Sequence, residues 1–410
     1  MKVFNLIYFG LILAMSLTVF GQTSDTALDL FKKGNFDEAD KIIKNPKSYD
    51  DLLLKGQISL FSNKLKEAKK YLEKAAKLKP DEKLPKQFLG EVFYRMNDFQ
   101  KASEMFAASG RETVAKKLAS FEEKKPYEIE SKAEITNIKF VKTDPLPIVS
   151  AKINGGEELN FIIDTGGGEL IVDSDIAAKY NLTQFGEETG TFGGGRRSAY
   201  LHGKIESFTL GEFTIKNVPI NIIKTQRFAA TLGIKNVDGI IGSILLSRFI
   251  STIDYPNAQL ILRKNTKENL GKLEKSIEIP FWMAGDHFLL AWGTVNKSPQ
   301  LLFIDSGLAG MGFTAPESTL KEAKINLGNQ SLEGVGGGGT VKVIPFVTDE
   351  ITLGTVKREK IIGIAGAFPP PLENGFGFRI GGLISHSFFR NHRVTFDFLN
   401  MRILMTEKTN

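Results

Sequence analysis

Two aspartates have sequence surroundings that could support acid–base chemistry. Asp164 lies in FIIDTGGGELIVD (residues 161–173), where apolar residues precede it and a hydroxylated residue and three glycines follow. Asp305 lies in LLFIDSGLAGMGFT (residues 301–314), again after apolar residues and before a hydroxylated residue and a glycine. One such motif alone indicates only a turn between two strands, because Asp and Gly are common turn residues. Two copies raise the question of whether the carboxyl groups act as a pair.

The sequences that follow the two aspartates repeat one pattern. Four landmarks recur at a constant offset of 143 residues: glycines at 193–195 and 336–338, TLG at 209–211 and 352–354, GII at 239–241 and GLI at 382–384, and IDY at 253–255 and FDF at 396–398. The aspartates themselves are 141 residues apart, at positions 164 and 305, so the second copy has two additional residues before its glycine cluster. Four ordered landmarks are hard to obtain by chance, and we therefore predict two homologous β units of about 130 residues each.

The region around these landmarks reads as β structure. After residue 122 helical periodicity stops, and alternating β-branched and aromatic residues begin, broken by glycine-rich turns. The stretch PIVSAKINGGEELNFIID predicts two strands joined at Asn154-Gly155, which is a strong hairpin signal.

Each half resembles one subunit of a retropepsin-like aspartic protease. The parts that carry the resemblance are FIIDTG, FGGG, DGIIG and TIDYPNAQLIL in the first half, and FIDSG, VGGGG, GGLIS and TFDFLNMRILM in the second. The resemblance implies an all-β bilobal retropepsin/pepsin-like aspartic protease domain within one chain. Its expected parts are a first lobe at 132–262, a linker at 263–277 and a second lobe at 278–407.

The resemblance also implies a role for each motif residue. Asp164 and Asp305 would be catalytic and would activate a water between them without any cofactor or metal, as a carboxylate pair that shares one proton can. Thr165, Gly166, Ser306 and Gly307 would hold the two active loops. The mobile flaps that bind substrate would contain Gly193, Gly194, Gly195, Gly336, Gly337 and Gly338. GII and GLI would pack behind the active loops, and Ser385, which replaces the glycine that Gly242 supplies in the first half, predicts weaker support for the second loop. Asp254 and Asp397 are expected to be strand-end or turn residues.

The chain before the β region is helical and also repeats. Residues 22–122 are rich in Ala, Lys, Glu and Leu, and Gly34, Asn63 and Asn97 each precede a similar Phe/Leu and Ala pattern. The second and third units carry small and large residues at the helix-contact positions Gly56, Ala68, Ala75, Pro80, Gly90, Phe93, Ala102 and Phe106. This resembles about three tetratricopeptide repeats, which bind peptides or partner proteins. An unrelated helical bundle is the alternative.

Composition excludes several other functions. The chain of 410 residues has a net charge of +6 without a basic run interleaved with aromatics, so no nucleic-acid partner is expected. It has no cysteine, which excludes disulfides, thiol nucleophiles and cysteine-ligated zinc, and its four histidines (His202, His287, His386 and His392) lack metal-site spacing. We expect a monomeric catalytic unit that acts on polypeptides.

The N-terminal segment MKVFNLIYFGLILAMSLTVFGQ predicts a secretory signal peptide at 1–21, cleaved after Gly21. The remainder would then be periplasmic or extracellular, and an uncleaved membrane anchor is the alternative. Two other functions stay open. The protein could be a non-catalytic module that binds peptides or glycans, or a scaffold in which proteolysis is secondary or serves autoprocessing.

Overall fold

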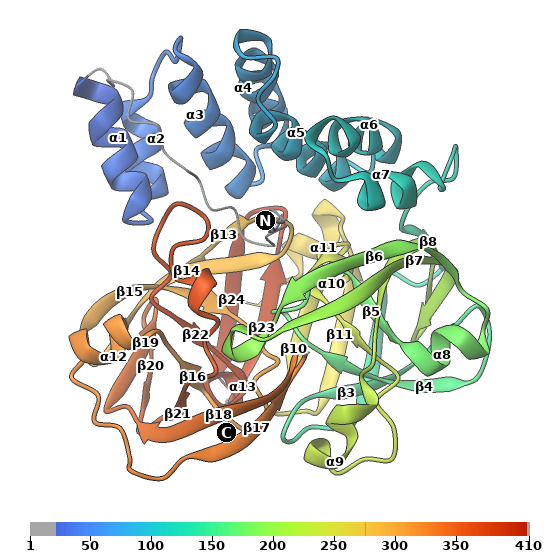
Figure 1. Ribbon diagram of the computed structural model, residues 1–410. Coiled ribbons are helices and arrows are strands. Elements are labelled where there is room, and N and C mark those ends of the chain that lie inside the picture. The colour runs from blue at the N-terminus through green and yellow to red at the C-terminus, as the bar shows by residue number, and fades with distance from the viewer. Residues whose placement is uncertain (1–21, 275, 408–410) are drawn as a thin grey trace, which may run out of the picture.

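The computed structural model describes residues 22–274 and 276–407, so the predicted signal peptide at 1–21 lies outside the described residues. A layer of helices comes first in the chain, and it packs against a β-rich body made of two lobes (Figure 1). The predicted change from helical to β structure near residue 122 is confirmed. Within the described residues, no helix combines the length and the apolar character needed to cross a bilayer.

The helical layer is built from short antiparallel helices joined by tight turns. Its helices are α1 (Gln22–Lys32), α2 (Phe36–Ile42), α3 (Tyr49–Phe61), α4 (Leu65–Leu78), α5 (Leu84–Arg95), α6 (Phe99–Ser109) and α7 (Glu112–Ala119). Gly34, Asn63 and Asn97 occupy the turns between α1 and α2, α3 and α4, and α5 and α6, and all three have positive φ angles of 78°, 55° and 61°. Glycine and asparagine tolerate this left-handed conformation best, which explains their recurrence in the sequence.

The helices of two pairs approach each other closely at glycines. A Cβ atom on Gly56 of α3 would lie 2.7 Å from the Leu72 side chain of α4, and one on Gly90 of α5 would lie 2.8 Å from the Phe106 ring of α6. A larger residue at either glycine would push the paired helices apart. The small residues of the sequence repeat therefore do set the distance between helices.

The first lobe follows the helices. Its strands are β1 (Glu128–Glu130), β2 (Ile135–Lys142), β3 (Ile148–Ile153), β4 (Glu158–Ile163), β5 (Leu170–Asp173), β6 (Thr183–Thr191), β7 (Arg197–Leu210), β8 (Phe213–Ile223), β9 (Gly239–Ile241), β10 (Phe249–Asp254) and β11 (Gln259–Lys264). Short helices α8 (Ser174–Lys179), α9 (Ala229–Leu232) and α10 (Ser243–Leu246) and the 3₁₀ turns η1 (Gly193–Gly195) and η2 (Gln226–Phe228) connect them. The predicted hairpin is present, because β3 and β4 pair antiparallel around Asn154 and Gly155, which have φ angles of 50° and 70°.

The second lobe repeats the central connections of the first. Its strands are β12 (Ile277–Pro280), β13 (Trp282–Ala284), β14 (Phe288–Val295), β15 (Ser298–Ile304), β16 (Phe313–Thr314), β17 (Leu332–Gly336), β18 (Gly339–Val347), β19 (Glu350–Leu353), β20 (Val356–Glu359), β21 (Ile362–Ala365), β22 (Gly382–Ile384), β23 (His392–Asp397) and β24 (Arg402–Glu407). Helices α12 (Glu317–Glu322) and α13 (His386–Phe389) and the 3₁₀ turn η3 (Pro370–Leu372) belong to this lobe. β15 pairs parallel with β22, as β4 pairs parallel with β9 in the first lobe.

The two lobes share a sheet. Helix α11 (Lys267–Gly271) lies in the predicted linker, between β11 and β12. β10 of the first lobe pairs antiparallel with β23 of the second, within the strand order β12-β24-β23-β10-β11-β2. The hydroxyls of Thr252 and Thr395 meet at 2.8 Å across this junction. Nothing in the sequence motifs predicts this pairing.

The helical layer contacts both lobes through buried side chains. Phe31, Phe36 and Phe61 of the first helices pack around Phe378 of the second lobe, with 4.9 Å between the ring centroids of Phe36 and Phe378. Helices α5 and α7 are both held to the first lobe by the carboxylate of Glu169. Since the layer touches both lobes, it bridges them on one side of the β body (Figure 1).

Candidate active site

The two motif aspartates lie at equivalent positions in the two lobes. Asp164 directly follows β4, and its backbone N–H donates to the Ile241 carbonyl of β9 at 3.0 Å. Asp305 directly follows β15, and its backbone N–H donates to the Ile384 carbonyl of β22, also at 3.0 Å. GII and GLI thus anchor the first residue of each active loop, as the sequence repeat suggested.

The hydroxylated residues after the aspartates connect the two loops. Thr165 Oγ1 donates to the Ile304 carbonyl and accepts from the Ser306 N–H, both at 3.0 Å. Ser306 Oγ donates to the Ile163 carbonyl at 3.1 Å and accepts from the Thr165 N–H at 3.0 Å. Thr165 is fully buried and Ser306 is 2% exposed. Four buried hydrogen bonds therefore cross from lobe to lobe directly behind the carboxyl groups.

The glycines after them place each loop against the opposite carboxyl group. The N–H groups of Gly166 and Gly307 donate to the carboxylates of their own loops, at 2.8 Å to Asp164 Oδ1 and 2.7 Å to Asp305 Oδ1. A Cβ on Gly166 would lie 2.2 Å from Cγ of Asp305, and one on Gly307 would lie 2.4 Å from Cγ of Asp164. No side chain fits at either position, so both glycines are sterically required. Each carboxyl group therefore lies directly against the loop that carries the other.

Burial and mutual contact change the acidity of both carboxyl groups. The pKa of Asp305 lies well above its ordinary value, because burial disfavours the ionised form and because the charge and hydrogen bond of Asp164 add to that effect. Burial also raises the pKa of Asp164, but the electrostatic effect of Asp305 as a hydrogen-bond partner, of the N–H groups of Gly166 and Gly167 and of the His287 side chain lowers it in part. We therefore expect the pair to retain one proton over a wide pH range, held more strongly by Asp305.

The support behind the two loops differs in chemistry. In the first lobe a Cβ on Gly242 would lie 2.1 Å from the Gly168 carbonyl, so this position admits only glycine. In the second lobe Ser385 is fully buried, and its Oγ accepts the Leu308 N–H at 2.9 Å. The expectation that Ser385 weakens the second loop is wrong, because its hydroxyl supplies a hydrogen bond to the loop that a glycine could not make.

The two glycine clusters lie at the tips of hairpins that touch each other. Gly193–Gly195 join β6 to β7, and Gly337 and Gly338 form the turn between β17 and β18. The N–H of Gly194 donates to the Ala367 carbonyl of the second lobe at 2.7 Å, and Arg196 Nε donates to the Thr340 carbonyl at 3.0 Å. All six predicted flap glycines thus lie in two hairpins, one from each lobe, that meet tip to tip.

Sequence reasoning missed a histidine beside the aspartates. His287 lies in the short loop between β13 and β14, where its Nδ1 contacts the carboxylate of Asp286, and a Cβ on Gly168 would lie 3.1 Å from that Nδ1. Its carbonyl accepts from Ser243 Oγ at 3.3 Å, which joins this loop to the first lobe. No spacing signal could have revealed it, because its loop lies outside the duplicated landmarks.

The helices are held to the first lobe close to the aspartates. Glu169, in the loop after Asp164, forms an ion pair with Lys117 of α7 and accepts a hydrogen bond of 2.8 Å from the Tyr94 hydroxyl of α5. Lys117 is 1% exposed and Glu169 is 7% exposed. The active loop of the first lobe is therefore tied directly to the helical layer.

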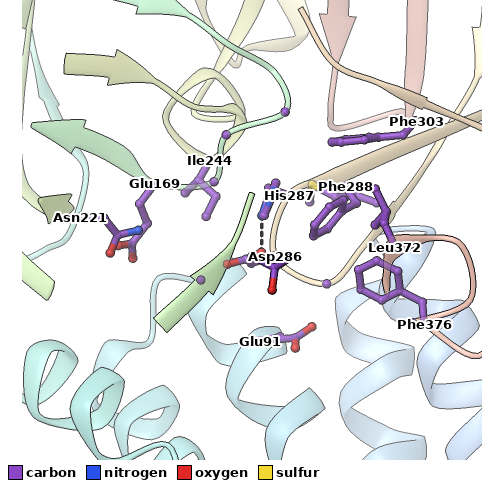
Figure 2. Close-up of a pocket in the computed structure, with 18 of the residues that line it drawn as sticks. Glu91, Glu169, Asn221, Ile244, Asp286, His287, Phe288, Phe303, Leu372 and Phe376 are labelled. Carbon is purple, nitrogen blue, oxygen red and sulfur yellow. Dashed lines mark hydrogen bonds and ion pairs between the residues drawn. The ribbon is translucent and has the colours of Figure 1, made fainter. Parts of the chain in front are cut away.

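One large cavity contains the candidate site. Its volume is about 2140 Å³, and its lining includes both aspartates, glycines of both hairpin tips and residues of α3, α5 and α7. Figure 2 shows its aromatic part, formed by Phe288, Phe303 and Phe376, beside Asp286 and His287. The volume exceeds the few hundred to one thousand Å³ of a typical small-molecule pocket.

The remaining candidates have structural roles. Asp254 and Asp397 each accept from a backbone N–H three residues later, Asn257 at 3.2 Å and Asn400 at 3.1 Å, and so close the turns after β10 and β23 as expected. Among residues 22–274 and 276–407 no group of three or more histidine or acidic side chains could hold a metal ion.

Comparison with known families agrees with this geometry. Residues 149–244 match the family model described as aspartyl protease. The matched range includes Asp164, the first flap and the GIIG element, and it lies within the first lobe. No curated protein matches the chain.

Proposed function

We propose that this protein is an aspartic endopeptidase that hydrolyses peptide bonds of extended polypeptides with a water activated by Asp164 and Asp305. The observation that carries the proposal is the meeting of two equivalent loops, one from each lobe, that bring two half-buried carboxyl groups together in one cavity. The match of the first lobe to the aspartyl protease family supports it.

The different surroundings of the two carboxyl groups support the roles that we propose for them. Ionised Asp164 accepts a proton from the water, whose oxygen bonds to the peptide carbon, while protonated Asp305 gives its proton to the carbonyl oxygen. The tetrahedral intermediate then collapses. Its C–N bond breaks, the nitrogen takes the proton from Asp164, and the hydroxyl proton returns to Asp305. Carboxyl pairs that share one proton in this way are best known from the aspartic proteases themselves.

The loop and flap residues would prepare the site for this reaction. Thr165, Gly166, Ser306 and Gly307 would hold the two carboxyl groups in place, since catalysis requires polar groups that are fixed before the reaction begins. The two flaps would open to admit an extended chain and close over it, which would exclude bulk water. No cofactor or metal takes part in the proposed steps.

The helical layer would act as a set of tetratricopeptide-like repeats that recruits the substrate or a partner protein. The glycine contacts at Gly56 and Gly90 and the turn residues between the paired helices support this assignment. The hydrophobic N-terminal segment supports export, and we propose a periplasmic or extracellular protein with a monomeric catalytic unit. The lobe boundaries at 132–262 and 278–407 are part of the same proposal.

One experiment tests the proposed activity. The protein is incubated with a mixture of unfolded proteins between pH 3 and 8, together with the variants Asp164→Asn and Asp305→Asn. Asp175→Asn is the matched control, because Asp175 is exposed on α8 of the same lobe. Cleavage by the wild type and by the control alone is the expected result. Equal cleavage by all four proteins would refute the dyad. Binding without cleavage by any of them would favour a peptide- or glycan-binding module.

A further inference from the structure

The cavity at the active site has a second acidic group that the proposed reaction does not use. Glu91 of α5 is 7% exposed and lines the cavity together with both catalytic aspartates. Its Oε1 accepts a long hydrogen bond of 3.5 Å from Gln87 Nε2, and its Oε2 has no hydrogen-bond partner among the described residues. A buried carboxyl oxygen without a partner costs free energy, and a ligand that supplies a donor would recover that cost.

Asp286 of the second lobe faces the same space. It follows β13 in the loop that carries His287, and Figure 2 shows its carboxylate between His287 and Glu91. Burial raises the pKa of Glu91, and the charge of Asp286 adds to this effect, so that the pKa lies at about 7. His287 in turn lies beside Gly168 in the first active loop. The Asp286–His287 loop therefore lies between the first active loop and Glu91 in the same cavity (Figure 2).

The neighbouring cations do not neutralise Glu91 through direct contact. Arg95, one turn further along α5, lowers the pKa of Glu91, but its guanidinium donates to the carbonyls of Leu60, Met283 and Gly285 at 2.8, 2.9 and 2.6 Å. Arg111 lies 3.6 Å from Glu188 on the first flap strand. The two Nη atoms of Arg95 and the guanidinium of Arg111 are thus directed to other partners, and Arg95 Nε has no hydrogen-bond partner among the described residues.

We infer that Glu91 and Asp286 form a subsite for a cationic nitrogen of the bound polypeptide. The nitrogen would belong to a Lys or Arg side chain or to a free amino terminus. The inference rests on the proposed function, since it assumes that a polypeptide occupies the cavity. It also gives the helical layer a direct part in choosing the substrate, because Glu91 belongs to that layer and Asp286 to the protease-like body.

Binding to an inactive protein tests the subsite. The full chain with Asp164→Asn is titrated, with fluorescence anisotropy as the readout, into apolar peptides in which one Lys is moved through successive positions. Each peptide is compared with its norleucine counterpart, with and without N-acetylation. We expect a preference for Lys of about tenfold or more at one position, or for the free amino terminus, as hydrogen bonds to charged groups give.

Variants decide whether Glu91 is responsible. Glu91→Gln keeps the shape of the side chain and should reduce that preference about tenfold, and Asp286→Asn should reduce it independently. Glu104→Gln on the exposed face of α6 is the matched control and should leave it unchanged. An equal affinity for Lys and norleucine at every position would overturn the inference, and so would a preference that survives both substitutions.

The outcomes separate this inference from the proposed function. Cleavage of unfolded proteins by the wild type, without a cation preference, would refute the subsite alone. A cation preference that depends on Glu91 in a protein that cleaves nothing would refute the endopeptidase alone.

Discussion

Removing one hydroxyl between the lobes should loosen the candidate site measurably. Thr165→Val keeps the shape of a fully buried side chain but deletes Oγ1, which makes two of the four hydrogen bonds between the loops. The Ser306 N–H and the Ile304 carbonyl would each lose this partner, and a buried polar group without its partner costs about 1–3 kcal/mol. We therefore expect a loss of about 2–6 kcal/mol in the free energy that keeps the two loops together.

Hydrogen exchange measured by mass spectrometry reports this opening locally. A loss of 2 kcal/mol corresponds to roughly 30-fold faster exchange through local opening for the Ser306 amide, because 1.4 kcal/mol is a factor of ten. Peptides that cover residues 161–168 and 301–310 should therefore lose protection together. Their joint response is the diagnostic feature, since the two segments belong to different lobes.

Thr209→Val is the matched control for this measurement. The Thr209 hydroxyl meets that of Thr214 at 3.1 Å within the β7–β8 hairpin, so its loss affects a single lobe. Exchange in the two active loops of this control should stay within a factor of two of the wild type. If Thr165→Val gave the same result as Thr209→Val, the hydroxyl bonds between the lobes would not hold the carboxyl pair in place, and our account of the site would be wrong.

Three further predictions follow from the same geometry. The pKa of Asp305 is raised in the folded protein, so the native state binds more protons than the unfolded state at pH values above the unfolded pKa of about 4. The stability of the wild type should therefore fall as the pH rises from about 4 through the folded pKa of Asp305. In urea unfolding, Asp305→Asn should therefore be more stable than the wild type at pH 7 but not at pH 3, and equal stability at pH 7 would contradict the raised pKa. Gly166→Ala places a methyl group 2.2 Å from Cγ of Asp305 and should lower kcat/KM at least about 100-fold, whereas Gly271→Ala, with nothing within 4 Å, should not change it. Lys117→Met leaves the buried carboxylate of Glu169 without its ion-pair partner and should destabilise the docked helices by about 3–5 kcal/mol. Limited proteolysis of residues 112–130 should then be faster than in the wild type. Lys116 is exposed, so Lys116→Met should be cleaved at the wild-type rate.

The duplicated motifs made much of the β body predictable. Each motif consists of a strand that ends in Asp-Thr-Gly or Asp-Ser-Gly, and a glycine hairpin and an apolar-apolar element follow at fixed spacing. These features predict turns and buried strands, because turns and strands depend mainly on residues that are neighbours in the sequence. The sheet shared by the lobes is different. β10 and β23 are both apolar strands, and nothing in either sequence states that one is the partner of the other. Their pairing depends on how two complete lobes fit together.

The same distinction applies to the side chains around the site. Thr165 and Ser306 could be assigned because they occur in the repeated motif. Glu91, Asp286 and Lys117 could not, because each looks like an ordinary charged residue until distant segments bring it into a cavity or an interface. Ser385 illustrates the opposite error. The change from glycine to serine predicted weaker support for the second loop, whereas the structure uses the new hydroxyl as a hydrogen-bond acceptor for that loop.

Carrying both lobes in one chain has a chemical consequence for the carboxyl pair. Two identical subunits would place both aspartates in equivalent surroundings, and only the shared proton could distinguish them. Here His287 and the N–H groups of Gly166 and Gly167 favour the ionised form of Asp164, while the favourable contribution to ionised Asp305 comes from the N–H of Gly307. Under the proposed mechanism, these different surroundings favour Asp164 as the base and Asp305 as the acid before any substrate binds.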